Sequence, residues 1–237
     1  MTTEPLRGLL QGLDPDRVRR SAGDADAAVS ATAQDDLRSG ALTPLRADGV
    51  RHLTVSCLLV AGDSGEPSVA LGLHRKSGEW RQVGGHLEAG DGSLLAAALR
   101  ELREESGVAA VVESAAGGSA GDRKESEGTS SNRDGDDRRA PHAGAVLLHA
   151  PVAVREFPVG GRDCASHVDV LFAARVPERV TLQTHDAGIA RIEWWSVSAL
   201  PEGTAPDLRR DLPQLLRRVA RSSAPAVVSP PPRADRS

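Results

Sequence analysis

The chain has 237 residues, a formal net charge of −4 and two cysteines, Cys57 and Cys164. This length suits one well-packed domain with extensions, or, as a second option, two small domains. The acidic balance argues against a nucleic-acid polymer as partner, because surfaces that bind such polymers are basic. Two cysteines make no disulfide framework, which fits the reducing cytoplasm. Since no apolar stretch reaches the ~20 residues of a membrane span, we also expect no membrane contact.

The first 48 residues are predicted to form a helical extension ahead of the main domain. In residues 4–20, apolar side chains recur at helical spacing. Residues 24–39 are rich in alanine and aspartate and are predicted to be helical as well. The apolar positions of the first segment are Leu6, Leu9, Leu10, Leu13 and Val18.

Two strands are predicted next, at residues 52–60 and 67–75. Both are apolar and rich in β-branched residues, and the turn-forming sequence Gly-Asp-Ser-Gly-Glu-Pro separates them. This arrangement is typical of a β-hairpin. A helix over residues 93–105 and a short strand over 108–112 follow.

Residues 113–142 have a different composition from the rest of the chain. Glycine, serine and mixed charges dominate, and large apolar side chains are almost absent. Such a segment cannot bury enough surface to offset its ordering entropy, so we predict a disordered insertion. The Pro- and Ser-rich tail, residues 222–237, is predicted to be disordered for the same reason.

Strand patterns resume at residues 145–159, 167–176 and 192–197, and residues 200–221 contain a final amphipathic helix. The apolar positions of that helix are Leu208, Leu212, Leu215, Leu216 and Val219. Strands and helices mixed in this order favour an α/β/α sandwich.

Residues 84–108 carry the most specific pattern in the chain. Glu101, Glu104 and Glu105 share one face of the predicted helix, because they stand at positions i, i+3 and i+4. Like charges in this arrangement repel one another by a few tenths of a kcal/mol per pair. A helix that gathers carboxylates in this way usually holds a cation, and hard divalent ions such as Mg²⁺ prefer these oxygens.

This stretch resembles the Nudix box of the Nudix hydrolases. That pattern reads Gly, five residues, Glu, seven residues, Arg-Glu, an aliphatic, any residue, Glu-Glu, any residue, Gly and an aliphatic. Here Gly85 opens it, its core runs from Arg100 to Glu105, and Gly107 followed by Val108 ends it. Many fixed positions agree at once, which makes the match highly specific. The resemblance covers residues 50–221 and implies an α/β/α sandwich with a mixed sheet, in a domain at 49–221.

The box departs from the pattern at its first acidic position. Asp91 stands where the family has glutamate, and eight residues, instead of seven, separate it from Arg100. The resemblance implies that these two residues form the ion pair that braces the loop. The loop around Asp91 is therefore where the structure is most expected to differ from the pattern.

The resemblance implies a pyrophosphohydrolase that depends on Mg²⁺, with Mn²⁺ as an alternative. Its small-molecule substrate would be a nucleoside diphosphate linked to another moiety, cleaved at the phosphoanhydride by a metal-activated water. Glu104 and Glu105 would be the principal metal ligands. Glu101 would be a further ligand or the base that orients water, and the Gly85 carbonyl is another ligand candidate. A homodimer is one option for the assembly.

Other residues are weaker candidates. Arg75, Lys76 and Arg81 could contact a diphosphate, or they could be solvated charges near a strand end. Asp169 or Glu193 could be an additional downstream acid. His86 is expected to serve as a structural residue of its turn.

The packing of the box helix and the tryptophans can also be predicted. Leu95, Leu99 and Leu102 form an apolar stripe expected to face the sheet. Ala97 and Ala98 are expected nearer the carboxylate face, leaving room for metal and phosphate. Trp80 is expected to pack the turn before the box, and Trp194 and Trp195 should point to opposite faces of their strand.

Two other functions stay open at this stage. A non-catalytic Nudix-like module would sense a nucleotide, although such modules usually lose box carboxylates. An isoprenoid diphosphate isomerase would need a proton donor and an acceptor near the metal. Cys57 is the only thiol near the box in sequence, and its apolar surroundings favour a place in the core.

Overall fold

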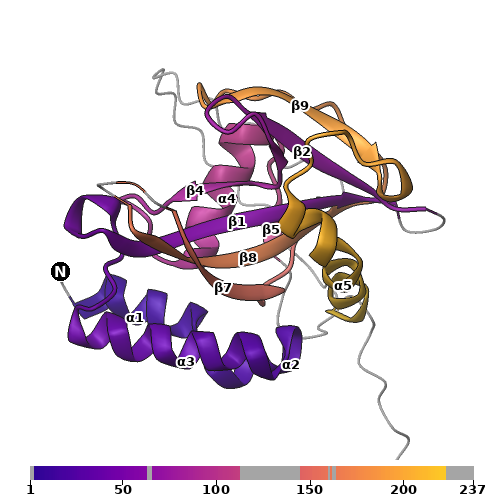
Figure 1. Ribbon diagram of the computed structural model, residues 1–237. Coiled ribbons are helices and arrows are strands. Elements are labelled where there is room, and N and C mark those ends of the chain that lie inside the picture. The colour runs from indigo at the N-terminus through magenta and orange to yellow at the C-terminus, as the bar shows by residue number, and fades with distance from the viewer. Residues whose placement is uncertain (1–2, 63–65, 113–144, 160, 162–163, 223–237) are drawn as a thin grey trace, which may run out of the picture.

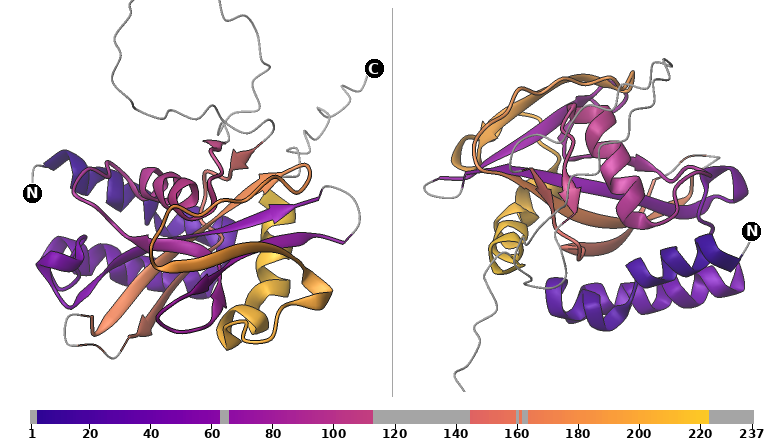
Figure 2. Two further views of the ribbon diagram at one scale, coloured as in Figure 1. Left: turned by 90° about the horizontal axis from the view of Figure 1, so that it is seen from above. Right: turned by 180° about the vertical axis from the view of Figure 1, so that it is seen from behind.

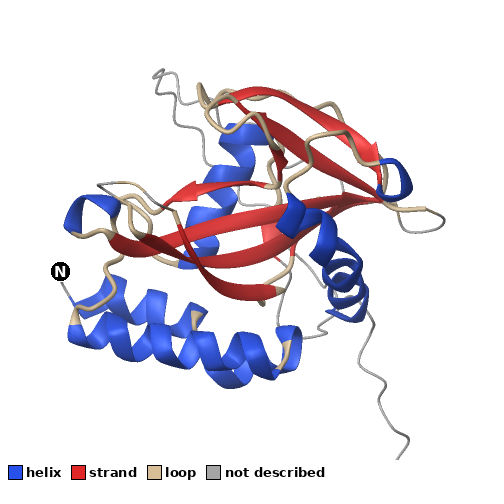
Figure 3. Ribbon diagram, viewed as in Figure 1, coloured by secondary structure: helices blue, strands red, loops and turns tan. Residues whose placement is uncertain are grey.

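The computed structural model describes residues 3–62, 66–112, 145–159, 161 and 164–222. The predicted insertion at 113–142 and the tail beyond residue 222 lie outside the described residues. Helices cover both faces of a mixed β-sheet, which confirms the α/β/α architecture (Figures 1 and 3). The helices are α1 (Thr3–Gly12), α2 (Pro15–Ala22), α3 (Asp24–Ser39), α4 (Leu94–Ser106) and α5 (Pro206–Ser222), with short 3₁₀ helices η1 (Arg46–Asp48) and η2 (Val197–Ala199). The strands are β1 (Arg51–Ala61), β2 (Ser68–His74), β3 (Trp80–Arg81), β4 (Val83–His86), β5 (Val111–Val112), β6 (Val146–Leu147), β7 (Ala153–Pro158), β8 (Ser166–Val176) and β9 (Ile189–Ser196).

The sheet is organised around β1 and β8. These two strands pair in parallel along their whole length, from Arg51 opposite Ser166 to Ala61 opposite Val176. The main order is β3-β2-β1-β8-β6-β5, and β4, β7 and β9 pair with β1, β8 and β2, respectively. β1 and β2 pair antiparallel, which confirms the predicted hairpin. Because β4 pairs with β1 at residues 54–57, the glycine turn of the box is fixed against the central strand.

Two predicted strands differ from the observed ones. The segment 145–159 is interrupted between β6 and β7, where Pro151 lacks the N–H that a continuing ladder would need. The segment 108–112 pairs only at Val111 and Val112, opposite β6. Val108 is instead buried in the core directly after α4.

The sheet has one hydrophobic core on each face. Along β1, Leu53 and Val55 belong to the core on the α4 side, whereas Leu58 belongs to the core on the α5 side. Trp194 packs on the α4 side and Trp195 on the α5 side, so the predicted opposite orientation is confirmed. Figure 1 shows α5 in front of the sheet with α4 behind it.

The N-terminal helices form a layer alongside α4, beneath β7 and β8 (Figure 2). The core that contains Leu102 of α4 also contains Leu13, directly after α1, together with Val18 of α2 and Leu37 of α3. The residues predicted as a helical extension therefore share a core with the box helix. None of the described helices has the length and apolar character needed to cross a membrane.

A buried ion pair joins α3, the sheet and α5. Asp26 of α3 lies 2.8 Å from Nη2 of Arg218 of α5 through Oδ2, and its Oδ1 accepts a hydrogen bond of 2.9 Å from the Val154 N–H. Arg218 also donates to the Val152 carbonyl at 2.8 Å. Both side chains are less than a tenth exposed. Asp26 and Arg218 thus neutralise each other, and each also forms a hydrogen bond to the backbone.

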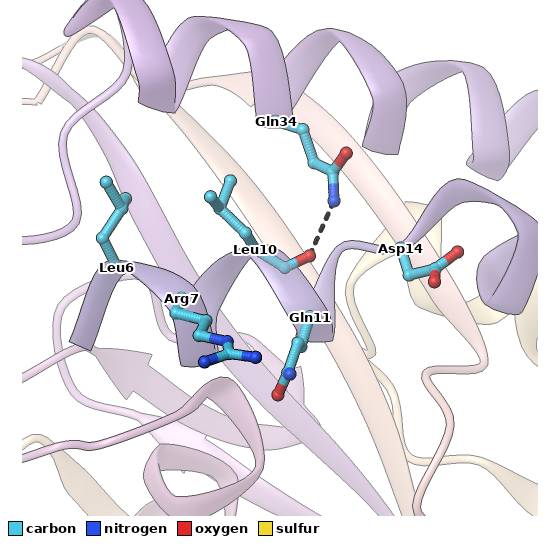
Figure 4. A pocket seen from close by; sticks show the side chains of 6 residues that line it. All are labelled: Leu6, Arg7, Leu10, Gln11, Asp14 and Gln34. Carbon is cyan, nitrogen blue, oxygen red and sulfur yellow. Dashed lines mark hydrogen bonds between the residues drawn. The ribbon is translucent and has the colours of Figure 1, made fainter. Parts of the chain in front are cut away.

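A hollow of about 340 Å³ lies between α1 and α3. Figure 4 shows its lining, including the hydrogen bond of 2.7 Å from Gln34 to the Leu10 carbonyl. Asp14 is the one acid among its lining residues, and these residues include no histidine or cysteine. The acidic residues of the candidate site lie elsewhere, around the turn between β4 and α4.

Candidate metal and phosphate site

The ends of α4 are set by its flanking residues. Ser93 caps the first turn, because its hydroxyl accepts a hydrogen bond of 3.1 Å from the Ala96 N–H. Gly107 ends the helix in the left-handed conformation, at φ 72°, which glycine adopts without strain. The three glutamates consequently stand in the last two turns of α4.

The buried side of α4 differs from the prediction by one position. Leu94 and Ala98 are fully buried together with Leu102, while Leu95 and Leu99 are only partly buried at its flank. Ala97 is also fully buried, so it leaves no open space beside the carboxylates. Small side chains instead let the helix approach the sheet closely, which draws the following turn of carboxylates toward β4.

The glycine turn of β4 encloses two carboxylates. The Gly84 N–H donates a hydrogen bond of 2.7 Å to Oε2 of Glu105. A Cβ on Gly84 would lie 2.4 Å from the Val55 carbonyl oxygen, and a Cβ on Gly85 would lie 2.7 Å from Oε1 of Glu101. Only glycine therefore lets backbone and carboxylates come this close.

Arg100 joins the box loop to the helix. Its Nη2 lies 2.9 Å from both Oδ2 of Asp91 and the His86 carbonyl. Its Nη1 lies 2.8 Å from Glu101 and 3.0 Å from Glu104. Burial alone would lower the pKa of this guanidinium, but the hydrogen bonds and charges of Asp91 and Glu101 raise it above its ordinary value.

The expected Asp91–Arg100 pair therefore forms despite the longer spacer. The loop that carries Asp91 forms a turn in which the Asp91 N–H donates to the Glu88 carbonyl, at 3.0 Å. The Glu88 N–H in turn donates to Oδ2 of Asp91, at 2.8 Å. Asp91, although its side chain is shorter than that of glutamate, thus contacts Arg100 and also forms hydrogen bonds within its own loop.

The acids at this site are held in an unfavourable environment. Burial raises the pKa of Glu105 to about 8, although the Gly84 hydrogen bond opposes the shift. Burial likewise raises the pKa of Glu101 to about 7, against the attraction of Arg100. Arg100 contacts Asp91, Glu101 and Glu104 together, so the negative charges outnumber this cation. Such a site favours an additional positive charge.

Residues 50–219, more than half of the chain, match the NUDIX domain. This chain belongs to the NUDIX family. Its NUDIX box is the segment from Gly85 to Val108, with the geometry just described. No curated protein matches the chain.

Several solved NUDIX structures resemble this chain. A NUDIX family hydrolase from Clostridium perfringens is 17% identical, with a TM-score of 0.48, and the match covers 71% of this chain and 98% of that one. The NUDIX domain of Shewanella oneidensis NrtR, solved with ADP ribose, is 17% identical with a TM-score of 0.44, covering 71% and 86%. A C. elegans Ap4A hydrolase is 10% identical with a TM-score of 0.44, covering 71% and 95%. Similarity at this level does not indicate a substrate.

The NUDIX box is accompanied by an acid that the sequence analysis missed. The segment before β9 is attached to the end of α4, because the Gln183 and His185 N–H groups donate to the Ser106 and Glu104 carbonyls at 3.0 and 2.8 Å. This places Asp186 where its charge contributes to raising the pKa of both Glu101 and Glu105. The only sign in the sequence is a polar His-Asp-Ala-Gly turn ahead of a strand.

The two acids proposed from sequence lie elsewhere. Asp169 is held on the α5 side of the sheet by hydroxyls of Thr54 and Ser56, at 2.9 and 2.5 Å. Burial raises its pKa, against these hydrogen bonds. Glu193 of β9 pairs with Arg191 at 3.4 Å. The structure therefore does not bring either acid together with the box carboxylates.

The predicted phosphate contacts separate into two groups. Arg75 is exposed, and its Nε donates to the Ala187 carbonyl at 3.0 Å, beside the segment that carries Asp186. Lys76 is exposed at the same strand end. Arg81 instead pairs with Glu79 and Asp207, at 2.9 and 3.3 Å, so its charge is already balanced.

The rings of Trp80 and His86 pack against other aromatic or histidine rings. Trp80 is 4% exposed and meets Trp195 at a ring distance of 5.3 Å, on the α5 side of the sheet. His86 offers its carbonyl to Arg100, while its ring turns toward other histidines. Neither ring is placed among the box carboxylates.

The residues of the box fit a hard divalent cation. Carboxylate and carbonyl oxygens are the ligands that Mg²⁺ uses, and Glu101, Glu104, Glu105 and Gly85 supply such oxygens at one turn. The Gly85 position, where a Cβ would collide with Glu101, keeps this turn open to the carboxylates. Burial, and to a smaller extent the neighbouring acids, raises the pKa values of Glu101 and Glu105, so a bound cation would stabilise their charged forms.

Proposed function

We propose that this NUDIX protein is a Mg²⁺-dependent hydrolase of a nucleoside diphosphate linked to another moiety. It cleaves the phosphoanhydride bond of that substrate. The observation that carries the proposal is the set of three α4 carboxylates gathered at the Gly84–Gly85 turn, with more negative charge than Arg100 balances. A solvated acidic helix face would not bury Glu101 and Glu105 in this way.

Each box residue has a defined task in the proposal. Glu104 and Glu105 are the principal metal ligands, for Mg²⁺ or Mn²⁺, and the Gly85 carbonyl is a further ligand. The Gly84 N–H orients Glu105, and Arg100 orients Glu104. When bound, the cation supplies charge neutralisation for the phosphate oxygens and lowers the pKa of a water. Arg75 and Lys76 are exposed cations suited to a diphosphate.

Glu101 is either a further ligand or the base that orients the attacking water. Its buried carboxylate lies against Gly85 and Arg100, a position that suits both tasks. Glu101→Gln distinguishes them. A ligand role predicts weaker Mg²⁺ affinity, whereas a base role predicts a lower kcat at saturating Mg²⁺ with the affinity unchanged.

A substrate panel is the direct test of the proposed function. Nucleoside triphosphates, ADP-ribose, dinucleoside polyphosphates, nucleotide sugars and NADH are incubated with the protein and Mg²⁺, and released phosphate or monophosphate is measured. Wild type should hydrolyse at least one compound, and Glu104→Gln should lose that activity. Glu178→Gln, at an exposed acid outside the box, is the matched control. Unchanged hydrolysis in Glu104→Gln would refute the assignment.

The same panel separates the two alternatives. A nucleotide-sensing module would bind one compound tightly in calorimetry and release no phosphate over hours. An isomerase would convert an isoprenoid diphosphate without hydrolysis, which mass spectrometry detects. The structure does not favour the isomerase, because Cys57 is fully buried and burial raises its pKa to about 12.

Two further properties belong to the proposal. The resemblance to Nudix hydrolases suggests a homodimer, and the cysteine content suggests a cytoplasmic protein. Analytical ultracentrifugation of the full chain tests the dimer, and a monomer at micromolar concentration would contradict it.

A further inference from the structure

Four metal-binding side chains meet at one end of β1, β4 and β8. They are His52, His86, Cys164 and His167, and one ligand atom from each lies within 4.8 Å of all the others. The Cys164 Sγ lies 3.7 Å from Nε2 of His52. The ring centres of the three histidines are 4.7 to 5.1 Å apart.

The sheet register brings these residues together. His52 and His167 are direct partners in the parallel β1–β8 pair. His86 stands opposite Thr54 in the β1–β4 pair, two residues along β1 from His52. By alternation along β1, His52 shares the sheet face of Thr54 and Ser56, which is opposite to the face of Leu53. Cys164, just before β8, completes the group.

From this geometry we propose that His52, His86, Cys164 and His167 form a structural zinc site, distinct from the carboxylates of the box. Three imidazole nitrogens and one thiolate are the ligands that suit zinc, whereas Mg²⁺ prefers oxygen. Four protein ligands leave no open position, which is typical of structural sites. Zinc bonds of ~2.0 Å to nitrogen and ~2.3 Å to sulfur separate two tetrahedral nitrogen ligands by about 3.3 Å and a nitrogen from a sulfur ligand by about 3.5 Å. The Cys164–His52 distance of 3.7 Å is close to the separation of a nitrogen and a sulfur ligand.

The hydrogen bonds of the cluster agree with a metal-binding role. His52 Nδ1 lies 2.9 Å from the Gly49 carbonyl, so its Nε2 faces Cys164. A second ring nitrogen fixed in this way is typical of histidine ligands. Nε2 of His86 and Nε2 of His167 are buried and have no hydrogen-bond partner within the described part of the chain. Buried polar atoms without partners are costly, and a bound metal would satisfy both.

The cluster is mechanically connected to the box through β4. His86 follows Gly85, and its carbonyl accepts a hydrogen bond of 2.9 Å from Arg100. A zinc ion would fix the His86 end of β4 against β1 and β8. We therefore expect zinc removal to lower the thermal stability of the protein, because metal binding to such a site contributes to folding.

Zinc content provides the first test. The full chain is purified without a histidine tag, and bound metal is measured by mass spectrometry after exhaustive dialysis. Wild type should carry about one zinc ion per chain. Cys164→Ser and His167→Gln should each weaken zinc binding at least about tenfold. Cys57→Ala, which removes the other thiol, and Glu105→Gln, which alters the box, should keep the zinc.

Cobalt substitution tests the ligand set directly in the wild-type protein. A thiolate bound to Co²⁺ gives a charge-transfer band in the near ultraviolet, which carboxylate ligands do not give. This band should be present in wild type and Cys57→Ala and absent in Cys164→Ser. The wild-type spectrum decides the matter even where a variant fails to fold. A wild-type protein with neither tightly bound zinc nor this band would overturn the proposal, as would a zinc content unchanged by Cys164→Ser.

Discussion

Two groups of charges in this protein, one buried and one partly buried, differ in their balance of acids and bases. The Asp26–Arg218 pair contains one acid and one base, and both also hydrogen-bond to backbone groups of residues 152 and 154. The box contains Asp91 and three glutamates of α4 around a single contacting cation, Arg100. The first group is complete in the folded chain, whereas the second still favours a cation.

We expect the balanced pair to stabilise the fold and the acidic group to bind a cation. A balanced buried pair is strongly destabilising to break, because one partner is left as an uncompensated buried charge. In an unbalanced group, by contrast, neutralising one acid relieves repulsion. Stability and activity should therefore respond in opposite ways to substitutions in the two groups.

Glu105→Gln should give the largest effect. We expect kcat/KM to fall about 1,000-fold, equivalent to about 4 kcal/mol of transition-state stabilisation. The metal-free variant should be at least as stable as wild type, because the new amide keeps an oxygen for the Gly84 N–H and cannot take the charged form that burial disfavours. Hydrolysis rates and thermal unfolding in EDTA check both parts. A variant that loses activity and stability together would mean that Glu105 is structural.

Arg218→Met should show the opposite behaviour. The free energy of unfolding should fall by about 3–5 kcal/mol, because Asp26 loses its buried partner. The kcat of the folded fraction should stay unchanged, since the pair does not touch the box. Urea denaturation measures the loss, with Arg217→Met at an exposed neighbour as control. If Arg218→Met is as stable as wild type, the contrast does not hold.

Asp91→Asn tests the longer box loop and should have a smaller effect. Arg100 keeps Glu101, Glu104 and the His86 carbonyl, so we expect about a tenfold loss of kcat/KM, or about 1.4 kcal/mol. Glu88→Gln, whose side chain lies 3.7 Å from Arg100 and is 66% exposed, should change little. Equal losses in the two variants would show that the loop is not held by Asp91.

The pH dependence should be the mildest effect. The pKa of Glu101 and of Glu105 rises from 4.5 in the unfolded chain to about 7 and about 8 in the fold. Folding therefore favours the protonated forms, and this contribution to stability is full below pH 4.5 and lost as the pH rises through 7 to 8. Metal-free wild type should lose stability relative to Glu105→Gln between about pH 5 and 8, as measured by urea denaturation in EDTA. Saturating Mg²⁺ should reduce this difference, and a pH-independent difference would contradict the prediction.

Local sequence patterns predicted the helix of the box well. Ser93 begins α4 through its side-chain cap and Gly107 ends it through its left-handed backbone, and the positions of the glutamates follow from helical spacing. The stripe of α4 was wrong by one position, because spacing alone did not show that Ala98 lets the helix approach the sheet. Local periodicity identifies a buried side less accurately than it identifies a helix.

Contacts between distant segments could not be predicted in this way. Asp186 reaches the box through backbone hydrogen bonds from a loop with no motif. The cluster of His52 and Cys164 depends on the parallel register of β1 with β8, which no local pattern encodes. Asp169, a reasonable candidate from its position on a late strand, points to the opposite face, because side chains alternate along β8 and its neighbours Val168 and Val170 face the α4 side.

The attachment of residues 183–185 to the end of α4 has an evolutionary consequence. Both hydrogen bonds use backbone N–H groups, so they do not depend on the side chains of Gln183 and His185. Substitutions in this segment can therefore alter the surroundings of Glu101 and Glu105 without detaching the loop. A lineage could diversify what this site accepts by changing side chains here, while the box itself stays intact.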